Sequence, residues 1–505
     1  MKKPYRIAGG LALLLILNLT TTVVAAGKQT IDQAANRAVQ YVHGKFGAKG
    51  VVAIDDWTII GLAMNGETIG TGRWGTKREW QAELEKRLRS LDPRKTTDYA
   101  RYVLTVAAAG EDPLRFGREN MIERIKGAQL ANGKFADSID GRGQELINAH
   151  VWSIIALHAA GEPIPRASLA KSWLISRQLP DGGFQFYSGA KQSGVDMTAM
   201  TLLAMRALGM TKDEQPVKRA LAYLKNAQTT GGGFLESGAP NSESAANVIS
   251  ALIAWGEQPN VWKKGTASVT DHLLGFQRTD GSFAHTRTGI GNQMATAQAL
   301  LALSDLERGT SYLNALREKT GSRRLSQLRD VPGSFWAFRE ISFLVKNGYL
   351  QGVTAAEMKP NHPVTRAQFA ALLLRAVGEV PNPRAQGIFR DVPVSDWSAP
   401  VVEKAAALGL MQGSQGIFRP HQGITHEEMA VITARVAQRY GWKKTFSSGY
   451  VNVEWSKVSS WARSSVKDLQ TRRLLGGTAT KRFDAKSGVT RAEAAVMLYR
   501  LLATR

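Results

Sequence analysis

Three motifs near the C-terminus place a basic or titratable side chain directly after a threonine. They read Thr365-Arg366-Ala367-Gln368, Thr425-His426-Glu427-Glu428 and Thr490-Arg491-Ala492-Glu493. In each, the threonine and the glutamine or glutamate form a capping box, which predicts the start of a helix. Capping does not need the residue between them, and helix-start amides attract anions. Arg366 and Arg491 are therefore candidate anion-binding residues. Because an unperturbed histidine is mostly uncharged near neutral pH, we expect weaker anion binding at His426.

A second set of polar residues lies near the starts of six expected helices in the first 320 residues. The set comprises Asp56, Asp98, His150, Asp196, Glu243 and Asn292. Gathered at one end of a shared cavity, such side chains line a ligand site or act as acids and bases. Simpler interpretations remain open: Asp98 and Asp196 are helix N-caps, and His150 is a core residue. Nearby aromatic residues either line the same cavity or belong to the core: Trp57, Tyr99, Trp152 and Trp255.

The threonine motifs close three units of one design. Thr365 and Thr425 are 60 residues apart, and Thr425 and Thr490 are 65 apart. The first two units open on Asp-Val-Pro, at Asp330 and Asp391, whereas the third has Asn452. Each unit carries a tryptophan at the matching position of the pattern, namely Trp336, Trp397 or Trp461. Self-similarity at a fixed period indicates a repeat architecture, so we expect three helical modules.

This pattern resembles three surface-layer homology (SLH) modules, at residues 328–380, 387–441 and 449–505. The resemblance implies a pseudo-threefold helical bundle that binds secondary cell-wall polysaccharide, often with pyruvylated sugars, without a covalent bond. It implies polysaccharide-binding roles for Arg366, Arg491 and the residue in their place, His426. It implies the same for three tryptophans and two acids: Trp336, Trp397, Trp461, Asp330 and Asp391.

A longer repeat fills the region before these modules. Its marker is Gln, three residues, Gly, one residue and Phe, and it begins at Gln129, Gln178, Gln228 and Gln277, in steps of 49, 50 and 49 residues. Apolar residues at three-and-four spacing precede each marker, and a second helical pattern ending in glycine follows it. Two further helix-and-glycine patterns lie upstream, at 57–66 and 99–110. Six helical hairpins predict an (α/α)6 toroid over residues 27–320.

The toroid region resembles the squalene cyclase and prenyltransferase superfamily. That resemblance is specific for the fold and weak for the activity, because one fold hosts many functions. A protonating cyclase needs a D-x-D-D cluster, and the nearest match, Ala53-Ile54-Asp55-Asp56, lacks the first acid. A prenyltransferase needs a zinc-bound thiolate, and the chain has no cysteine. We therefore expect no catalytic residues, metal or cofactor in the toroid, and favour a domain that binds an unidentified ligand or partner.

The N-terminal 26 residues predict a secretory signal peptide. Lys2, Lys3 and Arg6 precede an apolar stretch at 11–19 and the small residues 24–26. The apolar stretch is too short to span a membrane, although a retained anchor helix is the alternative. No later stretch reaches the length of a membrane span. We therefore expect a secreted protein without a membrane span after signal cleavage.

Charge is concentrated in the C-terminal modules. The chain carries a formal charge of +23, and residues 321–505 contribute 27 basic against 13 acidic side chains, or +14. A basic surface fits nucleic acid, an anionic membrane or an acidic polymer. Export argues against nucleic acid, so an anionic glycan linked to peptidoglycan is the expected partner. The predicted location is the cell wall or S-layer, and the alternative function is a wall-anchored enzyme acting on a polysaccharide or isoprenoid.

Overall fold

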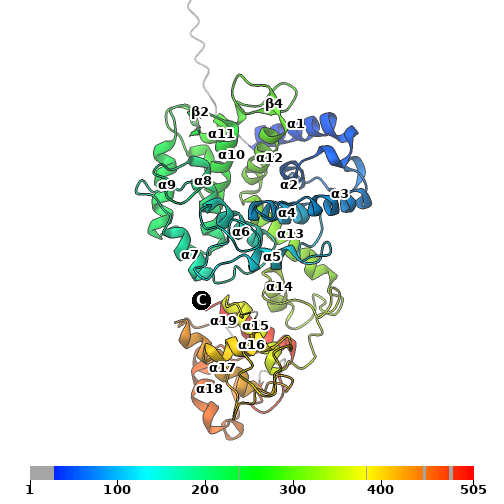
Figure 1. Cartoon of the computed structure of the whole chain (residues 1–505), viewed down its shortest axis with the longest axis vertical. Coiled ribbons are helices and arrows are strands. Elements are labelled where there is room, and N and C mark those ends of the chain that lie inside the picture. Colours follow the sequence, from blue (N-terminus) through cyan, green and yellow to red (C-terminus); the bar gives the residue numbers. More distant parts are fainter. Residues whose placement is uncertain (1–27, 237, 383, 447–450, 477–481, 505) are drawn as a thin grey trace, which may run out of the picture.

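The computed structural model describes residues 28–236, 238–382, 384–446, 451–476 and 482–504. The predicted signal peptide lies outside these residues. Within them the regular structure is almost entirely helical, which confirms the all-α fold class. Figure 1 shows a large body of helices joined to a smaller one that follows it in sequence. The first body has a buried core that runs from Ile31 to Leu316, and the second has its own core from Leu328 to Leu502.

Six inner helices form a closed ring in the first body. Each inner helix contacts the next, and the last returns to the first. The inner helices are α2 (Asp56–Met64), α4 (Thr96–Ala108), α6 (Ile147–Ala159), α8 (Val195–Ala207), α10 (Ser242–Ala254) and α12 (Gln293–Arg308). Their residues are apolar on most sides because each helix is covered by two neighbours and by an outer helix.

The outer helices alternate with the inner ones along the chain. They are α1 (Lys28–Phe46), α3 (Lys77–Arg89), α5 (Met121–Gly127), α7 (Ala167–Ile175), α9 (Gln215–Ala227) and α11 (Val269–Leu274). In α9 the buried residues are Val217, Ala220, Leu221 and Leu224, which lie at the three-and-four spacing of an amphipathic helix. The toroid of six helical hairpins is therefore present as expected.

The repeated glutamine joins each hairpin to the next. The side-chain amide of Gln228 donates to the carbonyl of Gly232 at 2.9 Å and to that of Trp262, before the next outer helix, at 2.9 Å. Gln129 and Gln178 make the same pair of bonds in their own repeats. Gln277 donates instead to Ala34 of α1, at 2.8 Å. The marker thus also closes the ring, because its last copy bonds to the first helix.

The marker glycine lets two backbones approach closely. Gly281 has a φ of 91°, and a Cβ there would lie 2.3 Å from the carbonyl oxygen of Arg37. Gly133 has the same φ, and its Cβ would lie 2.4 Å from the backbone of Leu169. A side chain is therefore excluded both by the left-handed backbone and by the neighbouring outer helix.

Helix α13 (Tyr312–Gln327) contacts four inner helices, α2, α4, α6 and α12. Its Arg324 forms ion pairs with Asp112 at 2.9 Å and with Glu162 at 3.0 Å, in the loops that follow α4 and α6. These contacts place α13 across the C-terminal ends of the ring. The N-terminal ends of the inner helices, which carry the candidate polar residues, form the other end.

The second body follows directly from α13. Its first helix, α14 (Phe338–Lys346), packs on α13. A Cβ at Gly348 would lie 2.2 Å from the carbonyl oxygen of Gly161, and Gly348 has a φ of 72°. The two bodies therefore touch backbone to backbone at this junction.

The bundle consists of three helix pairs in pseudo-threefold arrangement. The pairs are α14 with α15 (Arg366–Val377), α16 (Ala399–Ala407) with α17 (His426–Arg439), and α18 (Arg463–Thr471) with α19 (Arg491–Leu502). We call them the first, second and third modules. The helices α15, α17 and α19 all begin with the predicted capping box. Their preceding residues form a closed triangle of backbone hydrogen bonds, from Val364 to Val489, from Val489 to Ile424 and from Ile424 to Val364, at 2.8 to 3.0 Å.

Short strands and 3₁₀ turns connect these helices. The strands pair as β1 (Leu235–Glu236) with β2 (Ala239–Pro240), β3 (Phe283–Ala284) with β4 (Gly291–Asn292), and β5 (Asn452–Val453) with β6 (Arg482–Phe483). The first two pairs are antiparallel and the third is parallel. The 3₁₀ turns are η1 (Gly47–Lys49), η2 (Val51–Ala53), η3 (Gly72–Trp74), η4 (Pro259–Val261), η5 (Trp455–Lys457) and η6 (Ser460–Ala462).

Candidate functional site

Arg366 joins the first module to the second. Its Nε donates to the carbonyl of Phe418 and its Nη2 to that of Gln412, both at 3.0 Å. Its Nη1 forms an ion pair with Glu428, the capping acid of the second module, at 3.0 Å. The guanidinium also lies 5.0 Å from the centre of the Phe418 ring, and the side chain is only 11% exposed. Most of its donors are therefore already used within the protein.

Arg491 makes the same connection from the third module back to the first. Its Nε donates to the carbonyl of Met358 at 2.8 Å, and its Nη2 donates to that of Gln351 at 2.9 Å. Burial lowers the pKa of Arg491, although nearby Asp330 acts in the opposite direction. Two module connections out of three therefore depend on the motif arginine.

His426 occupies the equivalent position between the second and third modules. It is buried, its Nδ1 lies 3.1 Å from the carbonyl oxygen of Ser487, and its Nε2 lies 3.5 Å from Glu493. The ring is shorter than an arginine side chain. A groove of about 810 Å³ lies beside it, lined by residues that include Lys457, Arg482, Phe483 and Glu493. His426, the motif residue for which we expected the weakest anion binding, therefore borders a groove.

The opening aspartates hold a tight turn. Asp330 accepts from the backbone N–H groups of Met358 at 2.8 Å and Lys359 at 2.6 Å, and Asp391 accepts in the same way from Phe418 and Arg419. Lys359 and Arg419 have φ values of 53° and 61°. Burial acts to raise the pKa of Asp391, but the two N–H bonds outweigh it and lower that pKa.

The third module replaces this clamp with a strand pairing. Asn452, in the position of the aspartate, belongs to β5 and pairs with Arg482 of β6. The opening acids of the first two modules are thus occupied by backbone donors, a role that the sequence pattern did not reveal.

The three motif tryptophans are exposed at equivalent places. Trp336 is 43% exposed, Trp397 57% and Trp461 56%, each just before the first helix of its module. Large apolar side chains held in solvent at three repeated positions indicate an interaction surface. Of the residues proposed for polysaccharide binding, these three tryptophans are the ones whose side chains are exposed.

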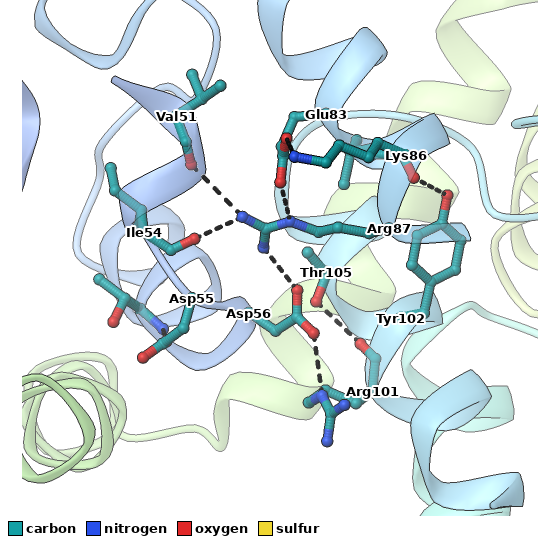
Figure 2. A network of polar contacts seen from close by, with 12 residues as sticks. Val51, Ile54, Asp55, Asp56, Glu83, Lys86, Arg87, Arg101, Tyr102 and Thr105 are labelled. Atoms are coloured by element: carbon teal, nitrogen blue, oxygen red, sulfur yellow. Dashed lines mark hydrogen bonds and ion pairs between the residues drawn. The ribbon is translucent and has the colours of Figure 1, made fainter. Parts of the chain in front are cut away.

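The toroid carboxylate Asp56 lies within an ionic network, drawn in Figure 2. One oxygen accepts from Arg87 at 2.8 Å and the other from Arg101 at 3.0 Å. Arg87 also bonds to Glu83 at 2.9 Å and to the carbonyl of Ile54 at 2.7 Å. Asp56 is therefore neutralised by two arginines.

The N-cap interpretation of Asp98 and Asp196 is wrong. The caps of their helices are Lys95 and Gly194, so Asp98 lies at the third helical position and Asp196 at the second. Asp98 pairs with Arg101 at 3.1 Å. The position of a cap depends on where the preceding loop ends, and a helix pattern does not determine that point.

Other polar residues do cap inner helices, and Asp55 and Asn292 are two of them. The side chain of Asp55 accepts from Thr58 N–H at 2.7 Å at the start of α2. Asn292 accepts from Ala295 N–H at 2.8 Å at the start of α12. Capping therefore accounts for the position of Asn292 without a ligand.

His150 is a core residue. It is fully buried, its Nδ1 accepts from Phe135 N–H at 3.0 Å, and its Nε2 donates to the carbonyl of Ala170 at 3.1 Å. In other repeats the hydroxyls of Thr198 and Thr296 accept from the marker phenylalanine in the same way. Burial lowers the pKa of His150 to about 3, so the ring is neutral.

A second group of carboxylates lies at the starts of α8 and α10. Burial raises the pKa of Asp196, which nearby Glu243 raises further, and burial also raises the pKa of Glu236, which nearby Asp196 raises further. Glu236 accepts from Val195 N–H at 3.0 Å, and Glu243 lies 2.9 Å from His285. No sequence pattern pointed to Glu236, because it lies after the repeat marker, which ends at Phe234.

Aromatic residues fill part of the ring. The rings of Trp57 and Trp152 lie 5.1 Å apart, although α2 and α6 are separated by α4, and both side chains are half-buried. Trp255 is buried and its indole N–H donates to the carbonyl of Leu202 at 3.0 Å. Tyr99 lines a pocket outside the ring instead. In the part of the chain that the structure describes, no cluster of side chains has the composition of a metal site, and no helix is long and apolar enough to cross a membrane.

Both bodies match domains of known protein families. Residues 327–370, 388–430 and 455–495 match the S-layer homology domain. Residues 100–256 and 248–348 match the prenyltransferase alpha-alpha toroid domain.

Individual relatives match parts of the chain. An amylopullulanase of Thermoanaerobacterium thermosulfurigenes is 33% identical over 33% of this chain and 9% of its own length. A surface-layer 125 kDa protein of Lysinibacillus sphaericus is 29% identical over 29% of this chain and 13% of its own. A drimenyl diphosphate synthase of Streptomyces showdoensis is 26% identical over 31% of each chain. The chain spans less than a fifth of the length of the first curated relatives that it matches. The chain therefore contains three C-terminal S-layer homology domains and an N-terminal prenyltransferase alpha-alpha toroid domain, and it is a protein of the cell wall or cell surface.

Proposed function

We propose that this protein is secreted and held on the cell wall by its SLH modules, which bind an anionic, pyruvylated secondary cell-wall polysaccharide without a covalent bond. The toroid is a non-catalytic domain that binds a ligand or partner at the cell surface. The observation that carries the proposal is the repeated exposure of Trp336, Trp397 and Trp461 on a bundle that carries a net +14. Exposed indoles offer flat faces to sugar rings, and the surrounding positive charge attracts an acidic polymer.

The occupied arginines change how the glycan is expected to bind. Because Arg366 and Arg491 connect modules, they support the bundle's shape and leave the direct contact to the tryptophans. Surface lysines and arginines supply a diffuse attraction that salt weakens. The bundle therefore binds the polymer through stacking and through charge spread over its surface.

The geometry of the toroid supports a non-catalytic role. Asp56 is held by two arginines, and His150 is buried and neutral. A general acid or base must reach a substrate proton, which neither group does in this arrangement. The helix α13 also crosses one end of the ring.

Sedimentation of the purified full chain with cell-wall sacculi tests the anchoring role. Each exposed indole contributes about 1 kcal/mol, so replacing all three motif tryptophans by alanine should weaken wall binding by about a hundredfold. The matched control is Trp455→Ala, because Trp455 is also exposed, at 38%, in the third module but is not the motif residue. Equal losses of wall binding in the control and the triple variant would show that the three motif tryptophans do not bind the polysaccharide.

One observation favours the alternative, a wall-anchored enzyme that cleaves a polysaccharide. Burial raises the pKa of Asp196 and of Glu236, nearby Asp196 raises that of Glu236 further, and glycoside hydrolysis needs a carboxylic acid with a raised pKa. Incubation with purified wall polysaccharide and measurement of new reducing ends decides between the two. We expect none; reducing ends that disappear with Glu236→Gln but persist with Glu145→Gln would establish the enzyme, because Glu145 is an exposed acid on a neighbouring loop.

A further inference from the structure

A pocket of about 770 Å³ lies between helices α3, α4 and α5 of the toroid, and none of the six candidate polar residues lines it. It is formed by the end of α3, the linker to α4, the start of α4, the loop at 117–119 and the first turns of α5. Its volume lies in the range of pockets that hold small organic ligands, about 300 to 1,000 Å³. None of the residues discussed for wall binding lines it.

One side of the pocket is apolar. Leu88, Leu91 and Met121 line it, together with Tyr99, which is only 7% exposed. The loop is held tightly against this wall, since a Cβ at Gly117 would lie 2.8 Å from Leu88. The wall therefore offers an apolar body a place to lose contact with water.

The other side carries three arginines, and two of them lack partners. Arg124 pairs with Glu119 at 2.6 Å and lies over the Tyr99 ring at 5.6 Å. Arg89 and Arg118 are exposed, and within the described residues neither has an ion pair or a side-chain hydrogen bond. They are the cations that remain available to a ligand.

Arg87 lies on the same helix as Arg89, and Figure 2 shows its contacts. Arg87 faces the ring and is neutralised by Glu83 at 2.9 Å and Asp56 at 2.8 Å. Arg89, two residues later, faces the pocket instead. The favourable effect of a cation in the last turn of a helix accounts for a base at either position, but only Arg87 is paired.

We infer that this pocket binds a small apolar monocarboxylate, with the carboxylate held by Arg89 and Arg118 and the apolar body against Leu88, Leu91 and Met121. The inference rests on the proposed ligand-binding role of the toroid and names the class of ligand. The planar guanidinium matches a carboxylate with two parallel hydrogen bonds. The pocket lining holds three arginines against Glu85 and Glu119, so one negative charge balances it.

Isothermal titration of the full chain with octanoate tests this site. Octanoate should bind, whereas octanamide, which has the same chain but no charge, should bind at least about tenfold more weakly because it makes no charge-assisted bond. The double variant R89A/R118A should lose octanoate binding by about tenfold or more. The matched control is Arg115→Ala, since Arg115 is an exposed arginine in the same loop that does not line the pocket.

The same titration separates two sources of the carboxylate. Trileucine with a free C-terminus and trileucine amide are the probes for a peptide end, and octanoate is the probe for a free acid. Binding of free trileucine but not its amide assigns the site to peptide C-termini, and octanoate alone assigns it to small acids. Failure of both probes, equal binding of octanamide, or equal loss in Arg115→Ala overturns the inference. Wall sedimentation of the same variants should be unchanged, so a failure here is distinct from a failure of the anchoring role.

Discussion

The toroid and the SLH bundle are both made of repeats, but they join neighbouring repeats with different chemistry. In the toroid a neutral amide makes the joint: Gln228 is 1% exposed and donates to two carbonyls. In the bundle an ionisable side chain at a helix start makes it, as Arg366 and Arg491 do. A neutral amide can be buried completely once it is hydrogen-bonded, whereas a guanidinium keeps some contact with water or an acid. The joints of the toroid can therefore lie deeper than those of the bundle.

In each region a histidine takes a place that another residue type holds in other repeats. His150 takes the place that Thr198 and Thr296 hold in other toroid repeats. His426 takes the place of the bundle arginines and borders a groove. His426 belongs to a bundle joint, whereas His150 holds the marker phenylalanine, so the two histidines test different contacts inside one chain.

The largest expected effect is on the toroid joint. Gln228→Ala leaves the carbonyls of Gly232 and Trp262 without their donor, and each unsatisfied buried group costs about 1 to 3 kcal/mol. We expect the free energy of unfolding of the toroid to fall by about 4 kcal/mol, measured by calorimetry of the full chain. Gln327→Ala, at an exposed position near the end of α13, is the control and should change it by less than about 0.5 kcal/mol. A change in Gln228→Ala as small as in the control would show that the glutamine does not join the repeats.

The second largest effect is expected at the joint between the first and second modules of the bundle. Arg366→Ala removes three hydrogen bonds and leaves Glu428 without its cation, so we expect a loss of about 3 kcal/mol in the stability of the bundle. The motif alone predicted an arginine that affects glycan binding while the fold stays intact. Arg375→Ala, on the same helix, is the control in the same melting experiment. If Arg366→Ala melts normally but loses wall binding, the arginine contacts the glycan directly.

His150 in the toroid should make stability depend on pH. The pKa of His150 is about 3 in the folded state, and an unfolded histidine titrates near 6.5. Below pH 6.5 the unfolded chain therefore binds a proton that the folded chain does not, and stability falls as pH falls toward 3. At pH 5 the loss is about 2 kcal/mol, since each pH unit corresponds to about 1.4 kcal/mol.

His150→Thr restores the hydroxyl that other repeats use, so it is the matched variant. Urea unfolding at pH 5 and pH 7.5 should show a smaller difference in this variant than in the natural chain. An equal difference in both would mean that other groups cause the loss of stability in acid.

The smallest effect is expected at the second bundle joint. His426→Arg supplies the longer side chain that Arg366 and Arg491 use, and Glu493 is present to pair with it. We expect the bundle to gain about 1 kcal/mol, seen as a higher melting temperature. Wall binding measured in parallel separates two readings of the groove. Tighter wall binding at pH 7.5 would show that a cation at this position contacts the glycan. Unchanged wall binding would show that the cation acts only in joining the two modules.

The sequence by itself determined the repeats and their helices. The capping boxes are local patterns whose side chains act within three or four residues, and the glutamine steps are a repeat that the sequence shows directly. The all-α class, the six hairpins and the starts of α15, α17 and α19 followed from them. The caps of α4 and α8 did not, because the loops before them end at Lys95 and Gly194 instead of at the nearby aspartates.

Only the tertiary structure decided what the candidate side chains contact. Arg491 donates to Gln351 and Met358, and Arg366 to Gln412 and Phe418, all distant in sequence. The raised pKa of Glu236 comes from burial beside Asp196, and neither the burial nor the neighbour is encoded locally. Arg87 and Arg89 lie two residues apart, yet one is neutralised and the other is available to a ligand. Residue type sets which interactions a side chain can make, but burial and charge partners depend on backbone segments that only folding brings together.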